Sequence, residues 1–407
     1  MTFIKHISSR HDAQGEDGST RKTGTGKKKS SKRRSLTAFI LSGGGARGAY
    51  ECGVYQSLVE HGVEPDILVG TSVGAINATA IAMGMTPATL TEIWLSIASP
   101  DSWLPTDILR KARVVFGNKN VFQNRRDFWN IPNWTYLFDT HPLKATLRKY
   151  FHSDALLRAN KQLLITAVEI QTGQFRMFKN REITLDHVLA SASIPIVFPW
   201  TKIGQEIFWD GGLLANVPPL RTAIEADPDV DEIYMVKLFP SMAPRPKTLI
   251  ACVERAIEIM LQGALNNEIA HMEFFNRLID EGRVQGDFKP IKLHTIEFHE
   301  PLEALSIINF DYGHVKKLIS TGRRDTDLYF LAQEREETAG RRARGRAKSS
   351  VQANSRPTPI VENPPEAPGK SKSRKRSRPA IHATRQFQTG PQRVDSKGSG
   401  KAPARGE

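Results

Sequence analysis

The sequence has few cysteines and no long apolar segment. Its 407 residues include two cysteines, Cys52 and Cys252, which excludes the disulfide framework of small secreted domains. No group of Cys, His or acidic residues has the spacing of a metal site, and we expect no bound metal. The N-terminal residues lack the apolar core of a signal peptide, and no run of about eighteen apolar residues occurs. We therefore expect a cytoplasmic protein with no signal peptide or transmembrane segment, and peripheral membrane contact at most.

Positive charge is in excess, but it is concentrated at the two ends of the chain. There are 57 Lys and Arg against 43 Asp and Glu, a net charge of +14. Residues 1–36 contribute +7 and residues 341–407 contribute +13, which leaves −6 for residues 37–340. The overall charge is therefore no argument for a basic nucleic-acid-binding domain.

The two ends are poor in apolar residues and contain the basic runs Lys27–Arg34 and Lys370–Pro379. Segments of this composition bury too little apolar area to offset the loss of chain entropy. We expect disordered basic tails at residues 1–36 and 341–407. As binding partners of these tails, anionic membrane is favoured over nucleic acid, which could bind through the tails only.

Strand and helix patterns alternate after residue 36. Leu36–Leu41 is a short β-type run, and apolar residues at helical spacing follow it as far as Gly62. A second strand pattern at Asp66–Gly70 leads into a helix that is apolar on nearly all sides and stops at Gly84. This order predicts parallel strands covered on both faces. The expected fold class is α/β, a three-layer α/β/α sandwich with a mainly parallel central sheet. Further strand patterns lie at 163–170, 232–239 and 291–298, and further helical patterns at 250–282 and 306–332.

Aromatic residues gather where the periodicity loosens, between residues 99 and 151. One interpretation is a lid over an apolar substrate, and the other is an irregular excursion with a small core of its own. Both stay open. The aromatic residues are Trp103, Phe116, Phe122, Phe128, Trp129, Trp134, Tyr136, Phe138, Tyr150 and Phe151.

A serine between two glycines follows the second predicted strand. Gly70, Ser72 and Gly74 form the pattern G-x-S-x-G on a strand-to-helix turn. Flanking glycines permit the crowded backbone that presents a nucleophilic hydroxyl, and the helix behind it adds a favourable dipole. The pattern alone is weak, because glycine and serine are common in turns. The strand before it and the buried helix after it make Ser72 the candidate nucleophile.

A glycine-rich loop, Gly43–Gly48, follows the first predicted strand with the sequence GGGARG. It also fits the dinucleotide-binding pattern G-x-G-x-x-G. That fold needs an acidic residue at the end of the second strand, whereas Asp66 stands at its beginning. The alternative is an oxyanion site built from backbone N–H groups at a helix N-terminus, with Arg47 adding or fixing positive charge. Because both loops follow parallel strands, we expect the glycines and Ser72 to face each other.

An acidic residue, Asp210, is followed by two glycines and preceded by the apolar run Ile207–Trp209. A lone Asp-Gly-Gly is usually a turn. In a chain that already offers a serine nucleophile and an oxyanion loop, Asp210 becomes the candidate general base.

The motifs GGGARG, GTSVG and DGG, in this order and spacing, resemble the patatin-like phospholipase family. The resemblance covers about residues 37–240 and extends to Asp139–Leu143, Thr166–Gly173 and Ala190–Pro199. It implies a serine acyl hydrolase that cleaves ester bonds of phospholipids or related lipids and requires no cofactor. The roles that it implies are a Ser-Asp dyad of Ser72 and Asp210, and an oxyanion loop of Gly43, Gly44, Gly45 and Arg47.

Two domains and one rival function follow from this resemblance. Residues 37–240 would be the patatin-like acyl hydrolase domain. Residues 241–340 resemble the C-terminal extension of some bacterial members, and we expect them to pack on the catalytic domain. The rival is a non-catalytic scaffold whose basic tails bind acidic membrane or nucleic acid. The sequence leaves the oligomeric state open.

Overall fold

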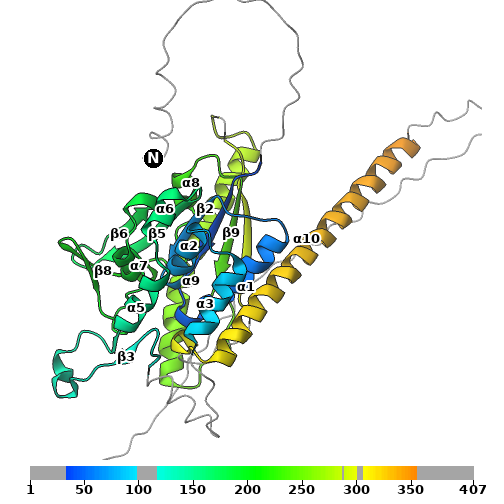
Figure 1. Cartoon of the computed structure of the whole chain (residues 1–407). Helices are drawn as coiled ribbons and strands as arrows, with labels where there is room; N and C mark the ends of the chain where they lie inside the picture. The colour runs from blue at the N-terminus through cyan, green and yellow to red at the C-terminus, as the bar shows by residue number, and fades with distance from the viewer. Residues whose placement is uncertain (1–33, 99–116, 287, 300–305, 355–407) are drawn as a thin grey trace, which may run out of the picture. The chain divides into compact units, whose positions relative to one another are not determined.

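The computed structural model describes residues 34–98, 117–286, 288–299 and 306–354 (Figure 1). The helices and strands are, in chain order, β1 (Thr37–Leu41), α1 (Gly48–Glu60), β2 (Ile67–Thr71), α2 (Val73–Ala82), α3 (Pro87–Ile97), β3 (Gln123–Asn124), β4 (Phe138–Asp139), α5 (His141–Tyr150), α6 (Ser153–Arg158), β5 (Gln162–Glu169), β6 (Phe175–Lys179), α7 (Leu185–Ser191), β7 (Thr201–Ile203), β8 (Glu206–Asp210), α8 (Arg221–Ala226), β9 (Glu232–Lys237), α9 (Leu249–Asp280), β10 (Lys292–Glu297) and α10 (Tyr312–Asn354). Short 3-10 helices are η2 (Gly45–Arg47), η3 (Phe128–Asn133), η4 (Asn180–Glu182), η5 (Gly211–Leu213) and η6 (Ser306–Ile308).

An eight-stranded sheet organises the described chain. Its order is β10-β9-β1-β2-β5-β8-β7, and β6 pairs with β5 beside this path. The five strands from β10 to β5 are mutually parallel, whereas β6, β7 and β8 join in antiparallel pairs. The predicted mainly parallel sheet is therefore confirmed. Its parallel part places the loops after β1 and β2 at one edge, the carboxyl edge.

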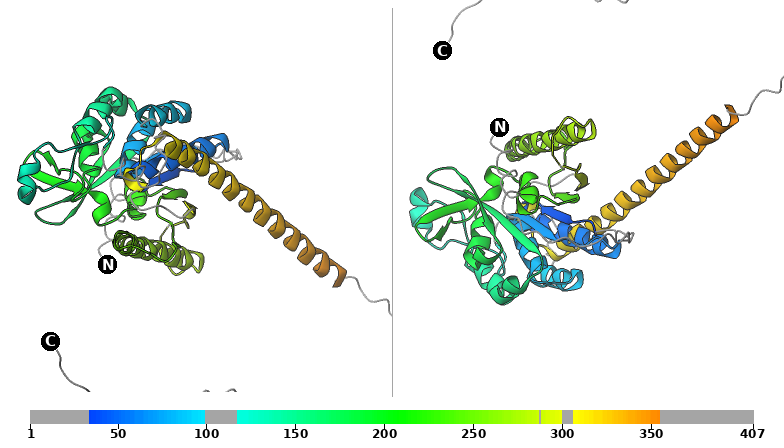
Figure 2. Two further views of the ribbon diagram at one scale, coloured as in Figure 1. Left: turned by 90° about the horizontal axis from the view of Figure 1, so that it is seen from below. Right: turned by 90° about the horizontal axis from the view of Figure 1, so that it is seen from above.

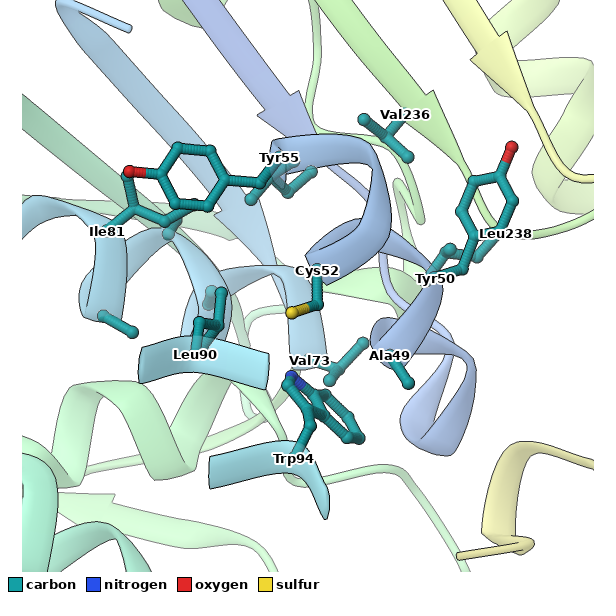
Figure 3. Packing of buried hydrophobic residues seen from close by; sticks show 14 of the residues in the cluster. Ala49, Tyr50, Cys52, Tyr55, Val73, Ile81, Leu90, Trp94, Val236 and Leu238 are labelled. Carbon is teal, nitrogen blue, oxygen red and sulfur yellow. The ribbon is translucent and has the colours of Figure 1, made fainter. Parts of the chain in front are cut away.

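Alternate residues of the central strand β1 pack into two separate cores. Phe39 and Leu41 belong to a core shared with α1, α2, α3 and α10. Ala38 and Ile40 belong to a core shared with α8 and α9 on the opposite face. Figure 2 shows helices on both faces of the sheet, and Figure 3 shows buried residues of the first core. The three-layer α/β/α sandwich is confirmed.

Two glycines let α10 pack closely on α1. A Cβ at Gly53 would lie 1.9 Å from the carbonyl oxygen of Ile319, and a Cβ at Gly322 would lie 2.1 Å from that of Tyr50. The two helix backbones therefore touch where any side chain would keep them apart. Beside this crossing the Tyr50 hydroxyl donates a hydrogen bond to Asp325 at 3.2 Å.

The segment after residue 240 contributes to the same sheet. β10 pairs with β9 in parallel register, with His294 beside Tyr234. The described residues up to Ala343 form one compact unit, and those from Arg344 on belong to a second.

The helix α10 continues beyond residue 340, where we expected a disordered tail to begin. Residues 341–354 are helical, and half of them are Arg or Ala, which have high intrinsic helix propensity. Residues 1–33 and 355–407 lie outside the described residues, and with them the run Lys370–Pro379 and nearly all of Lys27–Arg34. Among the helices that are described, none has the length and apolar character needed to cross a bilayer.

The aromatic segment contributes to the main core instead of forming a core of its own. Phe122 and Phe138 are both buried in the first core, with ring centroids 5.0 Å apart. Trp129 in η3 is 84% exposed. Trp103 and Phe116, also named for the lid hypothesis, lie outside the described residues.

A carboxyl group, that of Glu51 in α1, lies fully inside the first core. Its Oε2 accepts a hydrogen bond from Asn77 Nδ2 at 2.8 Å, and its Oε1 has no partner among the described residues. Burial raises the pKa of Glu51 to about 8, although hydrogen bonds from Asn77 and the Ser42 backbone oppose the shift. The folded protein therefore favours the neutral carboxyl.

We predict that Glu51→Gln reduces the loss of stability between pH 5 and pH 8. Because the folded pKa is raised, the stabilising contribution is complete below the ordinary pKa near 4.5 and is lost as pH rises toward 8. Removing this titration should reduce the slope of the free energy of unfolding against pH by up to about 1.4 kcal/mol per pH unit. Urea unfolding across this range measures the slope. Glu60→Gln, at the exposed end of α1, is the control, and equal slopes for the two variants would contradict the prediction.

Candidate active site

Strand β5 brings the serine and aspartate motifs together. Thr166 and Ala167 pair with β6 on one edge of β5. On the other edge Thr166 pairs with Thr71 of β2, and Ala167 pairs with Asp210 of β8. Along this edge of β5, the pairing with β2 ends at Thr166 and the pairing with β8 begins at the next residue, Ala167. The residue after Thr71 is Ser72, so the two candidate catalytic residues become neighbours through strand pairing.

The backbone at Ser72 is strained and tightly held. Ser72 has φ 57° and ψ −126°, and it caps the N-terminus of α2. Its N–H donates a hydrogen bond of 2.9 Å to the Ser191 hydroxyl. A Cβ at Gly74 would lie 2.4 Å from the carbonyl oxygen of Leu41, so the turn requires glycine there. This is the sharp strand-to-helix turn that the G-x-S-x-G pattern predicts.

The side chain of Ser72 lies beside the carboxylate of Asp210 and favours its charged form. Both residues are 4% exposed. The Gly212 N–H donates a hydrogen bond to Asp210 Oδ1 at 2.7 Å. Burial raises the pKa of Asp210 to about 7, and Ser72 and the Gly212 N–H only partly oppose this shift. A carboxyl group with this pKa can accept a proton near neutral pH.

The glycine loop lies against the serine, as the sequence predicts. A Cβ at Gly43 would lie 3.0 Å from Ser72 Cβ. The Gly43 N–H is already engaged, because it donates to the carbonyl oxygen of Asn216 at 2.9 Å, and Asn216 Nδ2 donates back to the Gly43 oxygen at 3.2 Å. Within the described residues the N–H groups of Gly44 and Gly45 have no acceptor. These two amides are therefore the ones free to bind an oxyanion.

Arg47 is buried beneath the loop, and Ser306 of η6 engages its guanidinium. Nε and Nη2 donate to the Ser306 hydroxyl at 3.0 and 2.8 Å. The guanidinium also lies over the Phe239 ring, 4.5 Å from its centroid, and Nη1 is 4.0 Å from Glu258. These contacts fasten the glycine loop to the part of the chain that follows β9. They support a role for Arg47 in holding the glycine loop in place better than a role in donating directly to an oxyanion.

An apolar cavity begins at Ser72 and follows one face of α2. Its empty volume is about 1010 Å³, mouth included. Ile76, Ala80 and Met83 line it at helical spacing, and its other walls come from α3, α5, α7 and η6. Ser72 is therefore buried from the surface but open to the cavity.

Other chemistry has less support in the structure. In the described ranges, no three His, Cys, Asp or Glu side chains are close enough together to hold a metal ion. His294 lies inside the sheet, where it contacts Tyr329 and Glu232. Glu232, which binds His294, begins β9 at the opposite edge of the sheet from the glycine loop that follows β1.

Three parts of the site were missed by sequence reasoning. They are Asn216, Ser191 and the apolar cavity. Asn216 follows the Asp-Gly-Gly motif by only a few residues, which is the one signal that could have marked it. Ser191 and the cavity are recognisable only once α7 and α2 are packed together.

Comparison with known proteins agrees with this geometry. Residues 39–223 match the sequence model described as patatin-like phospholipase. The chain is 28% identical over 241 residues to a cGAMP-activated phospholipase of Pseudomonas aeruginosa, covering 56% of this chain and 63% of that protein. It is 28% identical over 197 residues to an NTE family protein of Mycobacterium tuberculosis, covering 48% of this chain and 30% of that one. The chain thus spans less than two thirds of each relative.

Solved structures with a similar arrangement are more distant. VipD from Legionella pneumophila has a TM-score of 0.35 at 14% identity, covering 73% of this chain and 67% of that one. Human GIVD cytosolic phospholipase A2 has a TM-score of 0.37 at 9% identity, covering 72% and 58%. The family match includes the serine turn, the glycine loop and the aspartate together, and on this ground residues 39–223 of the chain are a domain of the patatin-like phospholipase family.

Proposed function

We propose that the protein is a serine acyl hydrolase that cleaves ester bonds of phospholipids or related lipids. The observation that carries the proposal is the position of Ser72 beside the buried carboxylate of Asp210, at the start of an apolar cavity. A nucleophile, a base of suitable pKa and an apolar binding site are the three parts that lipid ester hydrolysis needs.

The reaction would proceed in two halves. Ser72 Oγ attacks the ester carbonyl carbon while Asp210 accepts the hydroxyl proton. The N–H groups of Gly44 and Gly45 stabilise the oxyanion of the tetrahedral intermediate. The C–O bond to the alcohol then breaks, and Asp210 returns the proton to the departing oxygen. Water then attacks the acyl carbon while Asp210 accepts its proton. The bond between the acyl carbon and Ser72 Oγ breaks, Asp210 returns the proton to Oγ, and the free acid leaves.

The cavity is suited to hold the acyl chain of such a substrate. From Ser72 to Met83 the lining face of α2 extends for about 16 Å at the rise of an α-helix. The walls that meet it are also apolar, among them Leu90, Trp94 and Phe151. This length and lining favour a long acyl chain over a short one such as acetyl.

We predict that Ser72→Ala abolishes hydrolysis of long-chain lipid esters and labelling by a fluorophosphonate. The change removes the only atom that can become acylated, while the fold around it is held by backbone contacts such as the bond to Ser191. Lipid profiling by mass spectrometry and gel-based labelling measure the two losses. Undiminished labelling of the variant would show that Ser72 is not the nucleophile. Absence of turnover by the unaltered protein on every lipid ester tested would favour the alternative function, a non-catalytic scaffold.

We predict that kcat/KM rises with pH through an apparent pKa of about 7. Asp210 acts as base only when it is deprotonated, and its pKa is raised to about 7, so activity should fall as pH drops below that value. Asp210→Asn should remove nearly all activity at every pH. Asp186→Asn, at a half-exposed surface carboxylate, is the matched control and should keep the profile. A profile flat from pH 5 to pH 8 would exclude this role for Asp210.

We predict that Arg47→Ala lowers kcat by about 10²-fold with little change in KM, because the loop that Arg47 fixes acts on the transition state. If Arg47 works through Ser306, Ser306→Ala should lower kcat in the same direction, and the double variant should be no worse than Arg47→Ala alone. Ser320→Ala on α10 is the control. An unchanged kcat in Ser306→Ala would instead make Arg47 a direct contact of the oxyanion.

A further inference from the structure

The first half of α9 exposes an apolar face that the proposed chemistry does not use. Leu249, Val253, Ile257 and Met260 are 81%, 53%, 51% and 75% exposed. Their spacing of three and four residues places them on one side of the helix, here called the outer stripe. The opposite side of α9 is the one that packs on the sheet, through residues such as Leu265. The stripe is therefore an apolar surface in addition to the core-facing side.

The outer stripe lies at the carboxyl edge of the sheet. Gln262 Nε2 donates to the carbonyl oxygen of Pro240, which follows β9, at 2.6 Å. At the other end of α9, Asn276 exchanges hydrogen bonds with Ile291, which precedes β10. The helix therefore runs antiparallel to both strands, and the turns before Gln262 lie at and beyond the edge where those strands end (Figure 1).

The same part of α9 adjoins the catalytic loop. Glu258 lies in the same helical turns as the outer stripe but on the buried side of α9. Its Oε1 is 4.0 Å from Nη1 of Arg47, the arginine of the glycine loop. Two further exposed apolar residues, Leu213 and Leu214, follow directly after the Asp210 motif at this edge. Exposed apolar residues therefore occur both on α9 and directly after the proposed base.

Charge beside the outer stripe selects the kind of partner. The segment leading into α9 exposes Met242, Arg245 and Lys247. Among the described side chains of residues 241–260 there is no exposed carboxylate, because Glu258 is buried against Arg255. An apolar helix face with cations beside it is the pattern of helices that lie in the interface of an anionic bilayer.

We propose that the outer stripe, with Arg245 and Lys247, is a docking surface for an anionic lipid bilayer. Insertion of the stripe would set the carboxyl edge, where the turn at Ser72 lies, against the membrane surface. The inference agrees with the proposed lipid hydrolysis, but it concerns membrane binding, which can be tested independently of hydrolysis. It assigns membrane contact to the folded part of the chain in addition to the basic tails.

The test is co-sedimentation of full-length Ser72→Ala protein with vesicles of phosphatidylcholine and phosphatidylglycerol. The inactive background keeps the vesicles intact and makes the readout independent of hydrolysis. Measurements at low salt and at about 1 M salt separate the two contributions, because a Debye length of about 3 Å suppresses attraction by the tails. In high salt, binding should persist through the stripe.

The deciding variant is Val253→Glu with Ile257→Glu, and its matched control is Phe274→Glu with Phe275→Glu. The control changes two equally exposed apolar residues near the other end of the same helix. We expect the stripe variant to lose about tenfold or more of its high-salt binding and the control to keep it. Equal melting temperatures would establish that both are folded.

Three outcomes would overturn the proposal. The first is unchanged high-salt binding by the stripe variant. The second is absence of high-salt binding by the Ser72→Ala protein itself, which would leave the tails as the sole membrane contact. The third is a dimer in sedimentation analysis that the stripe variant converts to a monomer, which would make a second copy of the chain the occupant of this face.

Discussion

The closeness of Ser72 and Asp210 depends on how strand β5 shares one of its edges. β2 occupies that edge up to Thr71, and β8 occupies it from Asp210 on. A slip of one residue in either pairing would turn the aspartate to the other face of the sheet or move it away from the serine. The register of three strands therefore sets the distance between Ser72 and Asp210 more firmly than a loop could. In the proposed mechanism, this register takes the place of a third residue that would orient the base.

The site stores several unfavourable features that the surrounding packing must offset. Ser72 has a left-handed backbone, Asp210 is a buried carboxyl, and the amides of Gly44 and Gly45 have no acceptor in the part of the chain that the structure describes. Each would destabilise an isolated turn. They persist because α2 behind Ser72 is buried on almost every side, and because Asn216 clamps Gly43 through two hydrogen bonds. These three features thus gather at residues that the proposed reaction uses.

Local sequence patterns were sufficient for the parts of the site that are determined locally. The serine turn requires glycine at fixed positions, and the backbone of the glycine loop lies too close to its neighbours for side chains. Both requirements are visible as short motifs of consecutive residues. The partners that refine these motifs lie far away in sequence. Asn216 takes up the Gly43 amide, and Ser306 binds Arg47 from 259 positions along the chain. No periodicity or composition predicts such contacts, because they follow from packing. The apolar pattern of α9 predicted a helix, but only the fold shows which of its apolar residues stay exposed.

The contacts of Arg47 also change how the segment beyond the matched domain is to be regarded. The family match ends at residue 223, whereas Ser306, Glu258 and Phe239, which surround the guanidinium, all follow it. Arg47 belongs to the glycine loop that lies against Ser72, so the position of that loop depends on residues outside the matched domain. A change in η6 or in α9 would therefore reach the proposed oxyanion site through one buried side chain. Since α9 also exposes the outer stripe, whatever binds there is separated from this loop by the width of a single helix.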